Sequence, residues 1–167
     1  VKRAGIDPNE INDVLIGCAN QAGEDNRNVA RMGVLLAGLP ERVPATTINR
    51  LCGSSLDAII QASRAIKAGE ADIMVAGGVE SMSRVPMGSD GGPWALDPET
   101  NMAANFVPQG IGADLIATID GYTRSDVDTF AENSQKKAAA AQAKGYFNQS
   151  IVAVKDKAGV TILAQDE

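Results

Sequence analysis

The sequence predicts an α/β protein in which strands and helices alternate around a parallel sheet. Three short apolar runs, each bounded by polar or glycine-rich residues, are typical of buried strands. Two longer segments between them repeat apolar residues at helical spacing. The connections are short, as they are in βαβ units whose helices cover the faces of a sheet.

The predicted strands comprise residues 13–17, 45–49 and 72–76. The first and third are nearly continuous apolar runs, which are typical of strands buried on both faces. The second is rich in threonine, whose branched β-carbon favours extended backbone. Gly77 and Gly78 follow the third run, and they fit either a turn that ends the strand or a close approach of the backbone to a site.

The predicted helices between these strands comprise residues 29–39 and 53–68. The first follows an asparagine-rich loop, which offers capping side chains, and has Gly38 near its end. The second gathers its large aliphatic side chains on one face and stops at Gly69. These aliphatic residues are Leu56, Ile59, Ile60 and Ile66.

The pattern changes after the third strand. Residues 81–105 contain three prolines and three glycines and show no helical or strand period. Their methionines and Trp94 argue against disorder, so we expect an ordered covering loop. Further helices are expected over 110–120 and 125–145, and a pair of strands over 151–154 and 160–163. The second of these helices is expected to begin at Ser125, with Asp128 completing a capping box.

Composition excludes several classes of function. The net charge of −6 argues against a nucleic-acid groove and an anionic membrane surface, and there is no apolar run of the roughly 18 residues that a membrane span needs. The two cysteines, Cys18 and Cys52, are too few for a disulfide scaffold and fit a reducing cytoplasm. The sequence has no histidine, so it holds no Cys-His or Ser-His-Asp machinery, and we expect no metal site.

Cys52 is the strongest candidate for chemistry. It lies in the run 49–55, Asn-Arg-Leu-Cys-Gly-Ser-Ser, between the end of a predicted strand and the start of a predicted helix. Peptide dipoles and free N–H groups at a helix start favour the thiolate, which is the nucleophilic form, and can receive an oxyanion. A cysteine at such a junction is also often a small buried residue, and position alone leaves both interpretations open.

The run 49–55 resembles the nucleophile motif of the thiolases, which are acyltransferases that cleave or form 3-ketoacyl-CoA. Residues 17–31 resemble the strand, loop and helix that precede it in the family. Residues 76–83, Ala-Gly-Gly-Val-Glu-Ser-Met-Ser, resemble the family's signature after the nucleophile helix. The predicted helix 125–145, with the strand after it, resembles the family's loop domain.

The resemblance implies a layered α/β/α/β/α fold, of which this chain holds only an incomplete N-terminal sheet unit and part of the loop domain. Residues 1–82 would be part of the N-terminal α/β domain that carries the nucleophile, and residues 83–167 part of the covering loop domain. Members of the family pair as homodimers or homotetramers. We therefore expect a homo-oligomer in the cytoplasm, without nucleic-acid or membrane partners.

The reaction that the resemblance implies is that of an acetyl-CoA C-acyltransferase. Cys52 would attack the 3-keto carbon of a 3-ketoacyl-CoA, release acetyl-CoA and hold the shortened acyl group as a thioester until coenzyme A, the co-substrate, collects it. No permanently bound cofactor is implied. In the family a histidine of a Gly-His-Pro segment activates the nucleophile, and a second cysteine of a Cys-x-Gly segment serves as acid and base.

Neither of these groups is present, since the chain has no histidine and Cys18 does not match the second motif. The chain also begins without methionine, on a pattern that is typical of a helix end, and stops just after a strand-like run. We therefore expect a piece of a longer protein that is inactive alone.

Three departures from the family pattern bear on the substrate, and one of them is the segment 83–105, an unusual version of the covering loop. Ser55 stands where many biosynthetic members have glycine, and residues 108–110, Pro-Gln-Gly, stand where short-chain members tend to have His-Met-Gly. Together they favour a degradative thiolase of fatty-acid β-oxidation or related acyl-CoA breakdown that accepts a longer or bulkier acyl group. Four apolar residues fit either an acyl pocket or ordinary packing: Met87, Trp94, Met102 and Phe106.

Three alternatives stay open. One is a biosynthetic thiolase that forms acetoacetyl-CoA, and another is a decarboxylating condensing enzyme of the fatty-acid type, although residues 77–83 speak against the latter. The third is a non-catalytic, truncated thiolase-like module that only binds or oligomerises. Arg31 and Arg50 fit either local ion pairs or contacts with a partner subunit.

Overall fold

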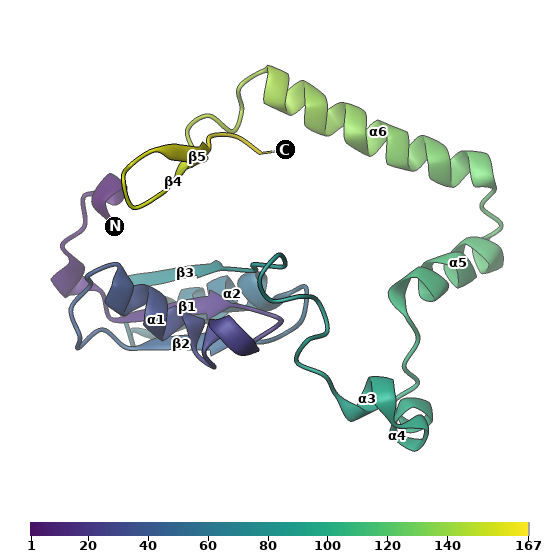
Figure 1. Cartoon of the computed structure of the whole chain (residues 1–167), viewed down its shortest axis with the longest axis horizontal. Helices are drawn as coiled ribbons and strands as arrows, with labels where there is room; N and C mark the ends of the chain where they lie inside the picture. Colours follow the sequence, from purple (N-terminus) through teal and green to yellow (C-terminus); the bar gives the residue numbers. More distant parts are fainter. Residues whose placement is uncertain (167) are drawn as a thin grey trace. The chain divides into compact units, whose positions relative to one another are not determined.

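The computed structural model describes residues 1–166 (Figure 1). The chain divides into two compact units, Val1–Asn105 and a second unit that begins at Phe106. The predicted division into residues 1–82 and 83–167 is based on the family resemblance and separates the chain by function. The division at Asn105 separates it into compact units, so the predicted one stays a prediction.

The first unit is built on a three-stranded parallel sheet, and the predicted α/β class is confirmed. Its strands are β1 (Asp13–Gly17), β2 (Ala45–Ile48) and β3 (Met74–Gly78), with β1 in the middle. Ile16 of β1 lies opposite Thr47 on one side and Gly77 on the other. Because all three strands run the same way, their carboxyl ends meet at one edge of the sheet.

The third strand lies later in the chain than the predicted 72–76. The side-chain oxygen of Asn12 accepts hydrogen bonds from the backbone N–H groups of Asp72 and Ile73, both at 2.9 Å. These bonds hold the two residues in a connection, and pairing with β1 begins only at Met74. Gly77 and Gly78 therefore belong to the strand, and the alternative that they form the turn ending it is wrong.

The helix α1 (Val29–Leu36) begins where it is predicted and ends three residues early. Asn28 caps it by accepting the backbone N–H of Arg31 at 3.1 Å. Its early end has a local cause, because Gly38 adopts φ 72° and turns the chain back. The N–H of Leu39 then donates to the carbonyl of Val34 at 3.1 Å, inside the helix end.

The helices α1 and α2 (Ser54–Ala68) cover opposite faces of the sheet. Val34 of α1 packs against Val14, whereas Ala58 and Ala62 of α2 pack against Leu15. Val14 and Leu15 are neighbours on β1, so their side chains point to opposite faces. The first unit is thus a three-layer arrangement of helix, sheet and helix.

The face of α2 that meets the sheet is not the aliphatic face that the sequence singles out. Ala58 and Ala62 are buried, whereas every large aliphatic residue of α2 is at least 36% exposed, namely Leu56, Ile59, Ile60 and Ile66. The small alanines let the helix lie close to the strands. The aliphatic face therefore points away from the sheet.

Part of the segment predicted to be irregular is helical. The short helices α3 (Pro93–Leu96) and α4 (Pro98–Ala103) each begin with proline, whose fixed φ suits the first helical turn. Asp97 caps α4 by accepting the N–H of Thr100 at 2.8 Å, and the Thr100 side chain, followed by this N–H, lowers the pKa of the Asp97 carboxyl. Short 3₁₀ helices precede them at Lys2–Ala4, Pro8–Glu10 and Gly23–Asp25.

Over the residues that the structure describes, the second unit contains two helices and one strand pair, as predicted. They are α5 (Gln109–Asp120), α6 (Arg124–Ala143) and the antiparallel strands β4 (Val154–Lys155) and β5 (Thr161–Leu163). The two strands are shorter than the predicted runs 151–154 and 160–163.

The cap of α6 differs from the predicted pair Ser125 and Asp128. Thr123 is the capping residue, and its hydroxyl accepts the N–H of Asp126 at 3.2 Å while the Asp126 carboxylate accepts the N–H of Thr123 at 2.8 Å. Both pairs have the spacing of a capping box, but the backbone is already helical at Arg124. Asp128 instead forms an ion pair with Arg124 at 2.9 Å.

Gly17 and Gly78 allow α2 to begin directly against the sheet. A β-carbon at residue 17 would lie 2.3 Å from the backbone of Ser54, and one at residue 78 would lie 1.7 Å from the hydroxyl of Ser55. Neither position has room for a side chain. At Gly77, by contrast, the nearest heavy atom to an added β-carbon is 4.0 Å away.

We predict that Gly17→Ala lowers the free energy of unfolding by about 1–3 kcal/mol, because the added methyl overlaps backbone that cannot move without shifting α2. The matched control is Gly77→Ala, which should change it by less than about 0.5 kcal/mol. Urea unfolding of the intact encoded protein measures both values. Equal losses for the two variants would contradict the close approach of α2 to β1.

Candidate active site

Cys52 lies at the carboxyl edge of the sheet, in the turn that joins β2 to α2. Its side chain is exposed, and the next residue, Gly53, is the N-cap of α2. No side-chain hydrogen bond caps this helix start. The thiol therefore lies near the positive end of the α2 peptide dipoles, although the N–H groups of Gly53 and Ser54 already donate to the carbonyls of Arg50 and Leu51, at 3.1 and 3.0 Å.

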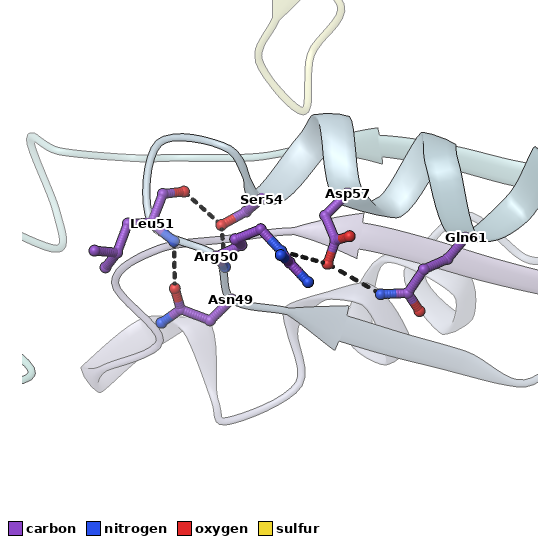
Figure 2. A network of polar contacts seen from close by, with 6 residues as sticks. All are labelled: Asn49, Arg50, Leu51, Ser54, Asp57 and Gln61. Atoms are coloured by element: carbon purple, nitrogen blue, oxygen red, sulfur yellow. Dashed lines mark hydrogen bonds and ion pairs between the residues drawn. The ribbon is translucent and has the colours of Figure 1, made fainter.

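The turn before Cys52 is held by side chains on both sides of it (Figure 2). Leu51 has φ 49°, an uncommon conformation for a residue with a branched side chain. Its N–H donates to Oδ1 of Asn49 at 2.9 Å, and its carbonyl accepts the hydroxyl of Ser54 at 2.5 Å. The same Ser54 hydroxyl accepts the N–H of Arg50 at 2.9 Å.

Arg50 pairs locally. Its Nε lies 3.1 Å from Oδ2 of Asp57, a buried carboxylate in the first turn of α2. Gln61 donates to the same oxygen at 3.0 Å, so this acid has two partners (Figure 2). The guanidinium of Arg31 is also used locally, on the carbonyls of Val43 and Glu41 at 2.6 and 2.9 Å. Arg50 thus forms the local ion pair that the sequence left open, whereas Arg31 makes local hydrogen bonds to carbonyl oxygens.

The loop after β1 connects the nucleophile turn to the next segment. Asn49 donates through Nδ2 to the carbonyl of Ala19 at 2.9 Å, and the N–H of Ala19 donates to the carboxylate of Glu80. Because Ala19, Asn49 and Glu80 follow β1, β2 and β3, these bonds tie the three strand ends together. The sequence shows no signal for this link, since each contact joins residues far apart in the chain.

The start of the predicted covering loop is tied to the same edge. Arg84 forms an ion pair with Glu24, and this pair lowers the pKa of the Glu24 carboxyl. The N–H of Gly88 donates to the side-chain oxygen of Asn20 at 3.2 Å. Further along, Met87 and Met102 are exposed, so neither forms part of the core of the first unit.

The second cysteine, Cys18, has a different environment. It is fully buried, and its thiol donates to Oδ2 of Asp25 at 3.2 Å and to the carbonyl of Asn20 at 3.6 Å. Burial, followed by the hydrogen bond and the negative charge of Asp25, raises the pKa of the Cys18 thiol from 9.0 to about 12. The thiol therefore stays protonated at neutral pH and anchors the loop after β1.

Residues 1–166 contain no group of three or more cysteine, aspartate or glutamate side chains placed to hold a metal ion. Over the part of the chain that the structure describes, no helix has both the length and the apolar character needed to cross a membrane.

Comparisons with known proteins agree with one another. A family model described as thiolase, N-terminal domain, matches residues 1–167. The β-ketoadipyl-CoA thiolase of Acinetobacter baylyi is 51% identical over 95% of this chain and 44% of its own length. The 3-oxoadipyl-CoA/3-oxo-5,6-dehydrosuberyl-CoA thiolase of Escherichia coli is 48% identical over 100% and 46%. The 3-ketoacyl-CoA thiolase of Aliivibrio fischeri is 38% identical over 99% and 43%.

The chain thus spans less than half the length of each of these relatives.

The two thiols should differ sharply in reactivity. We predict that iodoacetamide at about pH 8 labels Cys52 in the native protein and leaves Cys18 unlabelled, because only the first is exposed and the second stays protonated. Peptide mass mapping before and after unfolding in urea identifies the labelled residues. Labelling of Cys18 in the native state at the rate of Cys52 would contradict the buried hydrogen bond to Asp25.

Proposed function

Since this chain belongs to the thiolase family, we propose that it carries the nucleophile of an acyl transfer from 3-ketoacyl-CoA to coenzyme A, and that the nucleophile is Cys52. The observation that supports this most directly is the exposed thiol of Cys52 in the turn that leads into α2. The buried, protonated Cys18 does not offer an alternative nucleophile.

In the first step the Cys52 thiolate attacks the 3-keto carbon and forms a carbon–sulfur bond. The carbonyl oxygen becomes an oxyanion, which N–H groups at the start of α2 are suited to receive. Collapse of this intermediate breaks the bond between the keto carbon and its neighbour toward the thioester. The electron pair leaves with acetyl-CoA as an enolate, which takes up a proton, and the shortened acyl group stays on Cys52.

In the second step the thiolate of another coenzyme A attacks this thioester. The shortened acyl-CoA departs, and the Cys52 thiolate is restored. The first step needs a base for the Cys52 thiol and an acid for the enolate, and the second needs a base for the thiol of coenzyme A. The 167 residues have no histidine, and the Cys18 thiol is buried against Asp25, so the proposal assigns these roles to other residues of the encoded protein.

For the substrate we propose a 3-ketoacyl-CoA of a degradative route rather than acetoacetyl-CoA. Ser55 and the run 108–110 support this, because both depart from the biosynthetic and short-chain pattern. The names of the Acinetobacter and Escherichia relatives point to one candidate, β-ketoadipyl-CoA, whose acyl group has a free carboxylate at the end away from the thioester. Another 3-ketoacyl-CoA, the substrate class in the name of the Aliivibrio relative, is the other. A cytoplasmic homo-oligomer remains part of the proposal.

We predict that the intact encoded protein, mixed with a 3-ketoacyl-CoA and no free coenzyme A, gains the mass of one acyl group on Cys52. Cys52→Ser should abolish this adduct and lower turnover by about a thousandfold or more, because the second step has no thioester to attack. The matched control is Cys18→Ala, which should keep the adduct.

Intact mass spectrometry with peptide mapping measures the adduct, and thiolysis rates on the two candidate substrates measure the preference. A wild-type protein that takes up no acyl group would favour the non-catalytic alternative. An adduct that survives Cys52→Ser would assign the nucleophile to another residue.

A further inference from the structure

The turn that presents Cys52 places a leucine in a backbone conformation that leucine avoids. At φ 49°, the Leu51 side chain crowds its own backbone, and glycine, asparagine or aspartate is the usual choice at such a position. The Leu51 side chain is 65% exposed, so packing around it does not impose this conformation. Hydrogen bonds in the turn hold it: one is a backbone bond from the N–H of Ser54 to the Leu51 carbonyl at 3.0 Å, and the others come from side chains.

Two side chains bind Leu51 on opposite sides of its α-carbon (Figure 2). Asn49 accepts its N–H at 2.9 Å, and Ser54 donates to its carbonyl at 2.5 Å. We call these two bonds the Leu51 clamp. Both side chains are themselves fixed, because Asn49 also donates to the carbonyl of Ala19 and Ser54 is only 4% exposed.

The clamp determines where Cys52 points. The direction of the Cα–Cβ bond of Cys52 depends on the backbone angles of the residue before it, and Leu51 is that residue. Relaxation of Leu51 to an ordinary conformation would swing the thiol away from the start of α2. Attack on a carbonyl requires the reacting atoms to be close and aligned, so a small swing costs much of the rate.

We propose that Asn49 and Ser54 are positioning residues that aim the Cys52 thiol by holding Leu51 in its left-handed conformation. This inference rests on the proposed function, since it assigns a purpose to the geometry of the nucleophile. Neither side chain touches the reacting atoms in this role. Their effect on the reaction passes through Leu51.

The test compares acyl transfer by variants of the intact encoded protein. Ser54→Ala and, as a second variant that removes the other half of the clamp, Asn49→Ala should each lower kcat by about 10- to 100-fold and leave KM within about twofold. The matched control is Ser150→Ala, because Ser150 likewise donates to a carbonyl three residues earlier, that of Phe147, at 3.0 Å. This control should behave as wild type.

A Leu51→Asn background separates aiming from a general loss of structure. Asparagine adopts positive φ more readily than leucine and needs the clamp less. Ser54→Ala should therefore cost several-fold less in the Leu51→Asn protein than in the wild type. An equal loss in both backgrounds, or unchanged kcat in both Ser54→Ala and Asn49→Ala, would overturn the inference.

Amide hydrogen exchange distinguishes failure of the clamp from failure of the proposed function. In Ser54→Ala the N–H of Arg50 loses its acceptor, whereas that of Leu51 keeps Asn49 as acceptor and should exchange faster only because the loss of the Ser54 hydroxyl loosens Leu51. Unchanged exchange would show that the clamp is absent, whatever the activity. If the wild type forms no thioester while exchange responds as expected, the proposed function fails and the aiming role with it.

Discussion

The direct contact between the start of α2 and the strands β1 and β3 is the constraint on which the rest of the first unit depends. It exists because Gly17 and Gly78 have no side chains where Ser54 and Ser55 lie. The contact brings the helix start to the carboxyl edge of the sheet, where the three strand ends meet. The position of Cys52, one residue before the N-cap, follows from this packing rather than from any property of cysteine.

Around this contact, the charged and polar side chains at the carboxyl edge of the sheet form ion pairs and hydrogen bonds with one another. Asp57 forms an ion pair with Arg50, and Glu24 forms one with Arg84, so a positive charge lies beside each of these two acids. Cys18 and Asp25 share a buried hydrogen bond that keeps the second thiol neutral. The edge therefore offers one exposed thiol on a rigid support, which is the arrangement that nucleophilic catalysis needs.

Much of the fold could be predicted from the sequence, because elements such as strand 13–17 and the helix end at Gly69 depend on local patterns. The family resemblance is also confirmed. The errors come from contacts between distant residues. Asn12 delays the third strand through bonds to Asp72 and Ile73, and no local pattern reveals them. The spacing of apolar residues predicts the helix α2, but it does not predict which face of the helix packs on the sheet. The motif pointed to Cys52, whose catalytic role stays a prediction, whereas the role of Ser54 in the turn appears only once the backbone is known.

The outward aliphatic face of α2 has a thermodynamic consequence. The heat-capacity change of unfolding and the urea dependence of the unfolding free energy both scale with the surface that folding buries. For an ordinary domain the heat capacity rises on unfolding by about 12–15 cal/mol/K per residue. Leu56, Ile59, Ile60 and Ile66 stay at least 36% exposed in the folded chain and add less to either quantity than buried residues of their size. The chain by itself should melt over a broad range of temperature, with a shallow dependence of its stability on denaturant.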